Sequence, residues 1–387
     1  SENFEDIGKT ALLNDEIENL LLNSFCKGFR ILDKRFFPKF LNYLFSADVN
    51  RKRLSVEARG FTRINLKIGK VNDLTMFAPT SPEEQTAIAA FLDFKLSKID
   101  RFIRKKKQLV KLLNEQKAAI INQAVTKGIS DGKDAMNRVS TKPSGIEWLG
   151  DIPEHWEVRK LKYVTEVLRG KFTPRPRNDP KYYDGDYPFI QTGNITSTGK
   201  YIETYSQTLN ELGREVSKEF PINTVVMSVA ANIADVAILN FKACFPDSVI
   251  GFYPFEETDT DFLFYQLKNL RNEFYKIAIK STQYNLNVDR VKNVKVFIPS
   301  LTEQQQIVFH IETETSKLNQ TICTIEKEIT LVQEYKTALI AEAVTGKIDV
   351  RDYVIPQTEE IESDEEIEEE LNMVAEDEVA YETNDMD

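Results

Sequence analysis

The sequence repeats itself once, at an offset of about 220 residues. Residues 78–91 (APTSPEEQTAIAAF) align with residues 298–311 (IPSLTEQQQIVFHI) at an offset of 220, which places Gln85 opposite Gln305. Further along, KAAIINQAVT aligns with KTALIAEAVT at an offset of 219, so the second copy has lost one residue. A period of this length indicates a duplicated domain pair and not a solenoid of short repeats.

Each copy ends in a long helical pattern. The pattern runs for about 42 residues, which corresponds to a helix of about 60–65 Å. Apolar residues recur every three or four positions, at Ile88, Leu92, Leu96, Ile99 and Ile103 in the first copy and at Leu318, Ile322, Ile325, Ile329 and Val332 in the second. These residues form one narrow apolar stripe, or seam, along each helix. Seams this narrow favour two helices that pair as an antiparallel coiled coil. The alternative is that each helix packs on its own globular domain.

The residues outside the helices predict globular α/β domains. Short alternating runs such as TVVMSVA and VKVFIP indicate strands, and residues 260–278 indicate an amphipathic helix. The fold class is therefore α+β, with globular domains alternating with two long helices. The predicted boundaries are 1–80 for a partial first domain, 81–142 for the first helix and its linker, 143–298 for a complete second domain, 299–352 for the second helix and 353–387 for a tail.

The first domain contains only the back half of the second, including a helix at residues 36–45. Nothing in it matches the front half of residues 143–298. A deletion or a truncated start of the chain would explain this difference.

The net charge of −11 is unevenly distributed. Residues 356–387 contain fifteen acidic residues and no Lys or Arg, which is typical of a disordered, solubilising tail. An alternative is that this tail mimics DNA or occupies a basic groove. The rest of the chain holds 50 basic and 46 acidic residues, a body of about +4. The negative total therefore does not exclude a nucleic-acid binder, although +4 is small for a protein that binds DNA alone.

Few residues suit metal, redox or catalytic chemistry. Cys26, Cys244 and Cys323 are far apart, which favours a reducing cytoplasm over a disulfide framework or a zinc site. The chain has two histidines and no GxGxxG, P-loop, HExxH or GxSxG motif. No apolar run approaches the roughly 18 residues of a membrane span. We therefore expect a cytoplasmic protein that is not an enzyme, binds no membrane and holds no metal or cofactor of its own.

The most informative segment is basic. Residues 158–182 contain eight Lys or Arg and two acidic residues. A loop rich in Gly and Pro within this segment carries the candidates for contact with DNA phosphates: Arg169, Lys171, Thr173, Arg175 and Arg177. Arginine also reaches guanine edges in the major groove. The alternative is an ordinary solvated surface loop.

Other stretches supply amide and hydroxyl groups suited to base edges, because Asn and Gln can pair bidentately with adenine. The candidates are Gln191, Thr192 and Asn194 in one stretch and Lys280, Ser281, Gln283, Tyr284 and Asn285 in another. In the first copy the matching candidates are Arg59, Thr62, Arg63 and Asn65. They lie in residues 26–70, which hold twelve basic and three acidic residues, so both copies carry surplus positive charge. The alternative is that such stretches are ordinary turns with Asn side chains as caps.

Two conspicuous features are interpreted as structural. His155–Trp156 is expected to be a packing element at a domain entry and not a ligand. The cluster Lys105–Lys107 falls on the first long helix and is expected to be a solvated face, with contact to a partner or a phosphate as the alternative.

The segment PSGIEWLGDIPEHWEVRKL (143–161), followed by RGKFTPRP and YPFIQTGNI, resembles the start of a target-recognition domain. The family is that of the specificity subunits of type I restriction-modification systems. IPSLTEQQQIV and ALIAEAVTGKIDVR (338–351) resemble that family's conserved helix and its end, and the first helix follows the same pattern. The resemblance covers residues from about 30 to 352.

The resemblance implies a non-catalytic subunit that recognises double-stranded DNA. Family members have two target-recognition domains, each of which reads half of a split, asymmetric sequence, and two antiparallel helices that space them. Two modification subunits, which perform S-adenosylmethionine-dependent methylation of DNA, dock on this frame, and restriction subunits that use ATP and Mg can join them. The implied cofactors therefore belong to the partners. The first domain departs from the family pattern, because it lacks the opening segment and the basic loop.

Two other functions stay open on the residues alone. The chain could be a coiled-coil interaction protein without a DNA role. It could also be a nuclease or methyltransferase whose catalytic centre is assembled across the fold and leaves no local motif.

Overall fold

The computed structural model describes residues 7–13, 20–23, 26–57, 66–129, 140–146, 149–230, 232–280 and 284–356. The chain divides into two compact units. Unit 1 comprises residues 1–112 and 321–387, and unit 2 comprises residues 113–320. The acidic tail lies outside the described residues from residue 357 onward. The domain boundaries drawn from the sequence remain predictions.

Two long helices contribute to both units. They are α4 (Pro82–Lys127) and α10 (Leu301–Val344), with 46 and 44 residues, or about 69 and 66 Å. Each begins after a serine whose hydroxyl accepts a hydrogen bond from a first-turn N–H, with Ser81 before α4 and Ser300 before α10. This cap satisfies a backbone donor that has no partner inside the helix.

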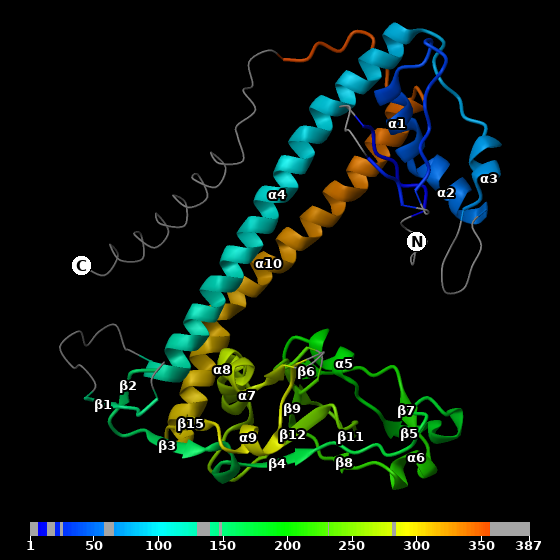
Figure 1. The fold of residues 1–387 in the computed structure, drawn as a ribbon. Helices are drawn as coiled ribbons and strands as arrows, with labels where there is room; N and C mark the ends of the chain where they lie inside the picture. The colour runs from blue at the N-terminus through cyan, green and yellow to red at the C-terminus, as the bar shows by residue number, and fades with distance from the viewer. Residues whose placement is uncertain are drawn as a thin grey trace, which may run out of the picture. The chain divides into compact units, whose positions relative to one another are not determined.

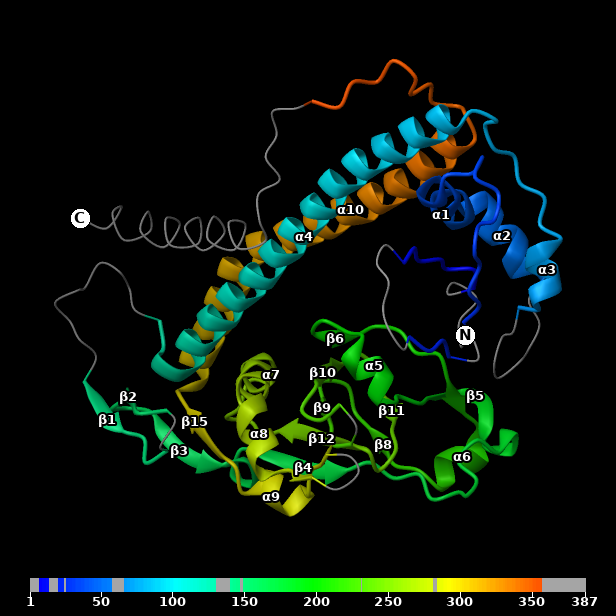
Figure 2. The same ribbon diagram turned by 45° about the horizontal axis from the view of Figure 1, so that its top comes forward.

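The two long helices lie side by side in opposite directions (Figures 1 and 2). In unit 1, Lys106 Nζ is 2.9 Å from Glu328 Oε2, and Lys336 Nζ is 2.5 Å from Asp100 Oδ1. Residue numbers therefore fall along one helix as they rise along the other, and the predicted antiparallel pairing is confirmed. The interpretation of Lys105–Lys107 as a solvated face is wrong for Lys106, because its side chain reaches across to the other helix.

The apolar seams face inward as predicted, and all ten seam residues are buried or half-buried. The helices also pack on the globular parts of the units. In unit 1, Leu92 and Leu339 share a core with Phe40. In unit 2, Val125 and Ile307 belong to the main core of the globular part. The two packing arrangements that the sequence left open therefore occur together.

The globular part of unit 1 is helical. It contains α1 (Pro38–Ser46), α2 (Asp48–Glu57) and α3 (Ile68–Asn72). Helix α1 confirms the helix predicted at 36–45 and has a proline in its first turn, where a missing N–H carries no penalty. The described residues of unit 1 form no strand.

Unit 2 is built around a five-stranded sheet with the order β4–β12–β9–β10–β6. The neighbouring strands are antiparallel except for β10 and β6, which are parallel. The strands are β4 (Thr165–Arg169), β12 (Val249–Pro254), β9 (Val225–Ser228), β10 (Val236–Leu239) and β6 (Tyr201–Ile202). Strand β9 confirms the strand predicted from TVVMSVA, and all four of its residues are buried.

Short two-stranded pairs surround this sheet. They are β15 (Lys295–Ile298) with β3 (Glu157–Lys160), β11 (Ala243–Cys244) with β8 (Glu219–Phe220), β5 (Tyr183–Pro188) with β7 (Thr208–Leu209), β13 (Ile279–Lys280) with β14 (Tyr284–Asn285), and β1 (Thr141–Pro143) with β2 (Asp151–Pro153). All five pairs are antiparallel. Strand β15 confirms the strand predicted from VKVFIP.

Helices cover the sheet and the loops of unit 2. They are α5 (Thr192–Thr196), α6 (Glu211–Glu215), α7 (Thr260–Asn269), α8 (Arg271–Ile277) and α9 (Val288–Lys292), with the 3-10 turns η2 (Leu161–Tyr163) and η3 (Pro180–Tyr182). The single helix predicted over 260–278 is wrong in one respect, because the chain breaks it into α7 and α8 at Leu270. This leucine is buried in the main core, so tertiary packing sets the break where no Gly or Pro marks it.

A buried glutamine fixes the start of α4 in unit 1. The Gln85 side chain donates to the carbonyl oxygens of Pro79 and Arg35, at 2.8 and 3.1 Å, and accepts a hydrogen bond from the Phe37 N–H at 2.8 Å. Its amide is therefore fully engaged although only 1% of the residue is exposed. Three separate pieces of backbone meet at this side chain.

Gln304 fixes the start of α10 in unit 2 in the same way. Its side chain donates to the carbonyl oxygens of Pro299 and Glu257, at 3.0 and 2.9 Å, and accepts from the Asp259 N–H at 2.8 Å. It is fully buried. The two helix starts are thus built alike.

This equivalence corrects the alignment of the repeat. The structural counterpart of Gln85 is Gln304, so the alignment that placed it opposite Gln305 is wrong by one residue. The prolines at 79 and 299 still differ by 220, while the glutamines differ by 219. The deleted residue therefore lies between the proline and the start of the helix, where a loop absorbs it.

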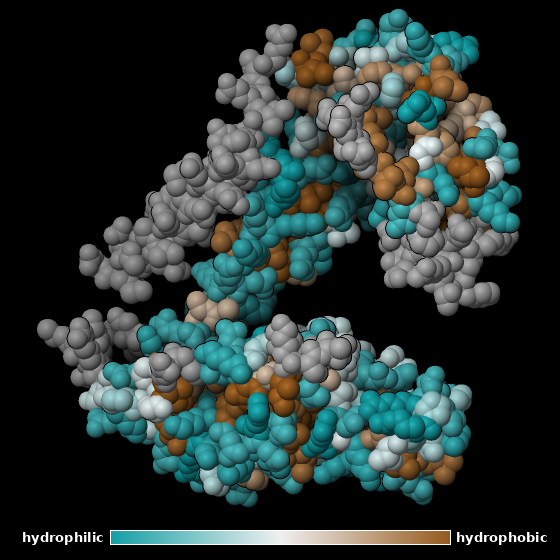
Figure 3. Space-filling model, in the orientation of Figure 1, coloured by the Kyte–Doolittle hydropathy of each residue, from teal (hydrophilic) through white to brown (hydrophobic). Residues whose placement is uncertain are grey.

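Apolar side chains also reach the surface. Figure 3 shows them in brown among the hydrophilic residues of each unit. In unit 1, Leu32, Val56 and Phe77 are 89%, 76% and 86% exposed. None of the helices formed by the described residues combines the length and the apolar character that crossing a bilayer requires.

Candidate nucleic-acid interface

A glycine holds the basic loop of unit 2 against the body of the unit. Strand β4 ends at Arg169, and a Cβ added to Gly170 would lie 2.3 Å from the Pro246 carbonyl oxygen. The next residue, Lys171, donates its N–H to the Phe245 carbonyl at 3.0 Å. Only glycine permits so close an approach of two backbones. The loop therefore leaves the sheet from a fixed point.

One aspartate binds two of the predicted arginines. Arg169 Nε donates to the Asp247 carbonyl oxygen at 2.6 Å, and Arg177 Nη2 lies 2.5 Å from Asp247 Oδ1. Both ends of the loop are thus tied to one residue of the neighbouring segment. The carboxylate balances the charge of Arg177, whereas the contact to Arg169 uses a neutral carbonyl.

Lys171, Thr173 and Arg175 are exposed between these anchors. Arg175 Nη1 donates to the Pro174 carbonyl at 2.8 Å, which is a neutral partner. Within the described part of the chain, no carboxylate forms an ion pair with Lys171 or Arg175. The unbalanced positive charge of the loop therefore lies at these two residues.

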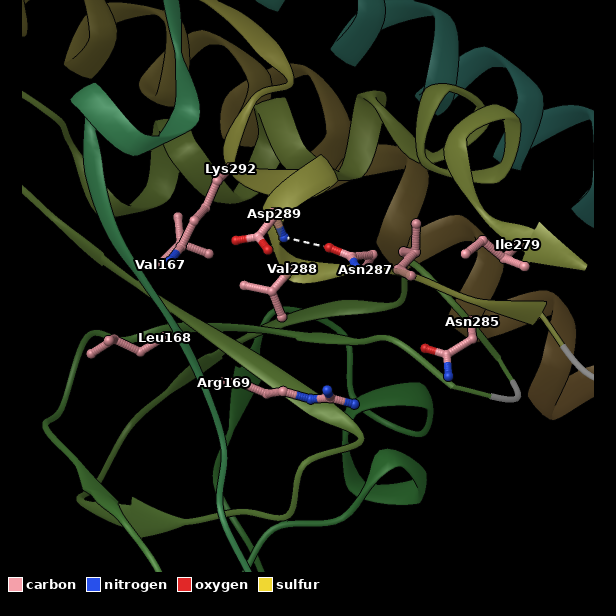
Figure 4. A pocket seen from close by; sticks show the side chains of 10 residues that line it. Val167, Leu168, Arg169, Ile279, Asn285, Asn287, Val288, Asp289 and Lys292 are labelled. Atoms are coloured by element: carbon pink, nitrogen blue, oxygen red, sulfur yellow. Dashed lines mark hydrogen bonds between the residues drawn. The ribbon is translucent and has the colours of Figure 1, made fainter.

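The fold brings Arg169 together with Asn285, which is more than a hundred residues away in the chain. Both line a pocket of about 570 Å³ between β4, β14 and α9. Figure 4 shows the Arg169 side chain extending toward the side of the pocket where Asn285 lies. Asn285 is exposed, and its backbone pairs with Ile279 in the hairpin and with Ala230 at the end of β9. A cation and an amide, both suited to nucleic acid, thus share one concave surface.

Three polar residues of the pocket were not predicted from the sequence. Asn287, Asp289 and Lys292 line it from α9 and the residue before that helix. Asn287 is the cap of α9, since its Oδ1 accepts from the Asp289 N–H at 2.7 Å (Figure 4). The capping pattern is visible in the sequence. Only the tertiary fold places this helix opposite Arg169.

The amide stretch at 191–194 forms the start of α5. Asn194 Oδ1 accepts a hydrogen bond from the Gln191 N–H at 2.9 Å, so its oxygen acts as a cap. The Gln191 side chain is exposed and donates to Gln207, and Thr192 is half-buried. The turn interpretation therefore describes Asn194, while Gln191 still presents a side chain to solvent.

Several candidates cannot be located. Ser281 and Gln283, and in the first copy Arg59, Thr62, Arg63 and Asn65, lie outside the described residues. The side chains of Lys280 and Tyr284 also lie outside the described part, although their backbones form β13 and β14.

The interpretation of His155–Trp156 as a packing element is confirmed. Trp156 is fully buried and stacks on Phe297, with ring centroids 6.0 Å apart. Its indole N–H donates to Glu303 Oε1 at 2.9 Å, and His155 Nε2 lies 2.9 Å from the other carboxylate oxygen. These contacts fix the domain entry to the first turn of α10. Nowhere in the described ranges do three His, Cys, Asp or Glu side chains gather as a metal site.

One segment of the chain matches a known family model. Residues 153–331 match the model of the type I restriction modification DNA specificity domain. This segment is therefore similar to the DNA specificity domain of type I restriction-modification systems. The match covers the basic loop, the pocket and the first part of α10.

The curated relatives that the chain matches include specificity subunits of type I restriction enzymes. The chain is 25% identical over 284 residues to the type I restriction enzyme MjaVIII specificity subunit of Methanocaldococcus jannaschii, covering 70% of this chain and 61% of the relative. It is 24% identical over 335 residues to the EcoDI specificity subunit of Escherichia coli, covering 80% of this chain and 70% of the relative. The chain thus spans less than two thirds of the length of the archaeal relative.

A solved structure has the same fold. It comes from a study of complex assembly and conformational transition of the type I restriction-modification system. The two chains are 16% identical and superpose with a TM-score of 0.60, over 80% of this chain and 72% of that one. The α+β architecture with long helices is therefore shared with that solved structure. These comparisons do not favour a coiled-coil protein without a DNA role or an enzyme.

Proposed function

We propose that this chain is the DNA sequence-recognition subunit of a type I restriction-modification complex. Its unit 2 reads one half of a split, asymmetric double-stranded target. The observation that carries the proposal is the shared pocket of Arg169 and Asn285, beside a loop whose Lys171 and Arg175 have no acidic partner among the described residues. Phosphate contacts position a protein on DNA and base contacts specify the sequence, and this surface offers groups for both.

Each side chain has a distinct role in this proposal. Lys171 and Arg175 contact phosphates, and Thr173 supports them with a hydroxyl. Arg169, Asn285 and Gln191 contact base edges or phosphates at the pocket. The remaining candidates of the hairpin and of the first copy contribute where they face the same duplex: Thr192, Lys280, Ser281, Gln283, Tyr284, Arg59, Thr62, Arg63 and Asn65.

The chain acts without catalysing the reaction. Two modification subunits dock on the helices and carry the S-adenosylmethionine-dependent methylation, and restriction subunits that use ATP and Mg join them in the cytoplasm. Residues 143–298 form the complete target-recognition domain, and residues 1–80 form a partial one. Because the body of the chain carries a surplus of only +4, tight binding of DNA requires the partner subunits to close around the duplex.

The assembled complex tests this assignment. Arg175→Ala should weaken binding to all sequences and lower the salt slope of the affinity by about 0.9. Asn285→Ala should instead relax one base position, at a loss of about 1–3 kcal/mol of discrimination. Binding to a panel of single-base variants of the target separates the two effects. If both variants bound every duplex as the wild type does, the interface would lie elsewhere.

A separate assay tests the absence of catalysis. The purified chain is incubated alone with DNA, Mg²⁺ and S-adenosylmethionine, and methyl transfer and strand cleavage are measured. We expect neither product. Turnover without added subunits would contradict the assignment of a pure recognition subunit.

A further inference from the structure

A second group of cations lies in unit 2, away from the basic loop. Helices α7 and α8 lie against the adjoining ends of α4 and α10 (Figures 1 and 2). Ile121 of α4 and Leu267 of α7 belong to the same core. Lys117 precedes Ile121 by one helical turn, and Lys268 directly follows Leu267. The packing of these helices therefore brings the two lysines to the edge of one contact.

The two lysines have neutral partners. Lys117 Nζ donates to Asn319 Oδ1 of α10 at 2.6 Å. Lys268 Nζ lies 5.6 Å from the centre of the Phe264 ring. Among the residues that the structure describes, neither ammonium group lies within ion-pair distance of a carboxylate. Neither lysine therefore has an ion-pair partner of its own among these residues.

Arg271, the first residue of α8, completes the group. Its Nη1 lies 2.8 Å from Asp235 Oδ1, and the other oxygen of that carboxylate accepts from Thr196 Oγ1 at 2.7 Å. The Asp235 side chain is only 13% exposed, whereas that of Arg271 is 49% exposed. The aspartate thus orients the guanidinium and leaves part of it open to solvent.

The lysines repel one another. Burial lowers the pKa of Lys117. Burial also lowers the pKa of Lys268, and the charges of Lys117 and Arg271 lower it further. The charge of Asp235 opposes these effects on the pKa of Lys268, so this one aspartate acts on both Lys268 and Arg271. Such a cluster is unfavourable until an anion approaches it, since an anion would stabilise all three charged groups.

We propose that Lys117, Lys268 and Arg271 form a second phosphate-binding surface, which contacts the backbone of double-stranded DNA independently of its sequence. The inference rests on the proposed DNA recognition by unit 2 and adds a contact outside the 169–177 loop. In that loop Asp247 balances Arg177 and the cations sit on exposed turns. The residues of the second surface lie on the helices α4, α7 and α8.

The test uses the full chain in its complex with modification subunits. Lys117→Gln and Lys268→Gln should each lower the salt slope of the DNA affinity by about 0.9, to the same extent for target and unrelated duplexes. Lys117→Arg and Lys268→Arg keep the charge and should keep the slope. Lys276→Gln is the matched control, because this lysine of α8 is already ion-paired with Glu273 at 2.5 Å.

A footprint of the wild-type complex avoids any effect of substitution on folding. DNA should slow the acetylation of Lys117 and Lys268 several-fold and leave that of Lys276 unchanged. If wild-type DNA binding were intact while neither lysine was protected and both slopes were unchanged, the inference would be overturned and the proposed function would stand. Protection by the modification subunit without DNA would assign the surface to a protein contact and overturn the inference as well. A wild-type complex that bound no DNA would contradict the proposed function itself.

Discussion

Gln85 and Gln304 make the same three hydrogen bonds at the starts of the two long helices. Each buried amide joins the helix to a preceding loop and to the segment before the first or seventh helix. The repeat in the sequence is thus a repeat of one structural joint. Neither amide could be lost without leaving buried backbone groups unpaired.

Replacing either glutamine with alanine should destabilise its own unit. Gln85→Ala leaves two carbonyl oxygens and one N–H without their partner, and we expect a loss of about 2–4 kcal/mol. Gln304→Ala should cost a similar amount. Hydrogen exchange at the first turns of α4 and α10, together with urea unfolding, measures the loss in each unit. The exposed Gln333 on α10 is the control, and a Gln333→Ala loss equal to that of Gln85→Ala would refute the argument.

The ammonium group of Lys200 is expected to stabilise unit 2 in a pH-dependent way. It lies 2.8 Å from Asp261 and also pairs with Glu312. Burial opposes the charge, but the hydrogen bonds to the two carboxylates outweigh it and hold the pKa of Lys200 above its usual value. A raised pKa stabilises the folded state below the unfolded pKa of about 10.5, and this contribution is lost as the pH rises above it.

Lys200→Met should therefore lower the free energy of unfolding by about 1 kcal/mol at pH 7, since the side chains of its partners Asp261 and Glu312 are 30% and 49% exposed to screening solvent. The difference from the wild type should stay constant up to about pH 10 and narrow above it. Urea unfolding at a series of pH values measures it. If the difference in unfolding free energy between the wild type and Lys200→Met grew at high pH, the ion pairs of Lys200 would not be its source.

The cations of the basic loop should contribute unequally to DNA binding. Lys171 and Arg175 have no acidic partner among the described residues, whereas Arg177 is paired with Asp247. Lys171→Ala and Arg175→Ala should each lower the salt slope by about 0.9. Arg177→Ala should lower it less, because a carboxylate already balances this charge. If all three variants lowered the salt slope of the DNA affinity equally in the assembled complex, the Arg177–Asp247 ion pair would have to open when DNA binds.

Gly170→Ala should disrupt the loop although it adds one methyl group. The added carbon would lie 2.3 Å from the Pro246 carbonyl oxygen, so the backbone must move. We expect a loss of about 1–3 kcal/mol in stability and a marked loss of DNA binding. Gly193→Ala is the control, because nothing lies within 4 Å of a Cβ at that position. A Gly170→Ala protein with wild-type stability would mean that the two backbones do not approach so closely.

The sequence predicts the repeating parts of this molecule well. The seams of α4 and α10 follow from the spacing of their apolar residues, because burial on one face of a helix requires that spacing. The break at Leu270 could not be predicted, since it is imposed by the packing of a buried leucine and not by Gly or Pro. The one-residue error in the repeat has a similar cause, because a loop can lose a residue while the hydrogen bonds beyond it are kept.

Only those parts of the candidate site whose residues lie close together in the sequence were predicted. The basic loop stands out in composition, and its arginines were found for that reason. Asp247 was not assigned to them, because it lies seventy residues away and meets them only when β4 pairs with β12. Lys117 and Lys268 were also missed. Each lies on an ordinary amphipathic helix, and the two come together only through helix packing.

The close contact at Gly170 separates what must be kept in this interface from what is free to change. The glycine and the 245–247 segment determine how the chain leaves the sheet, and no side chain of Lys171, Thr173 or Arg175 takes part in that contact. The exposed residues at the tip of the loop can therefore be substituted without altering how the chain leaves the sheet. The strength of the proposed phosphate contacts could then change through substitutions at a few exposed positions, without a new core or a new fold.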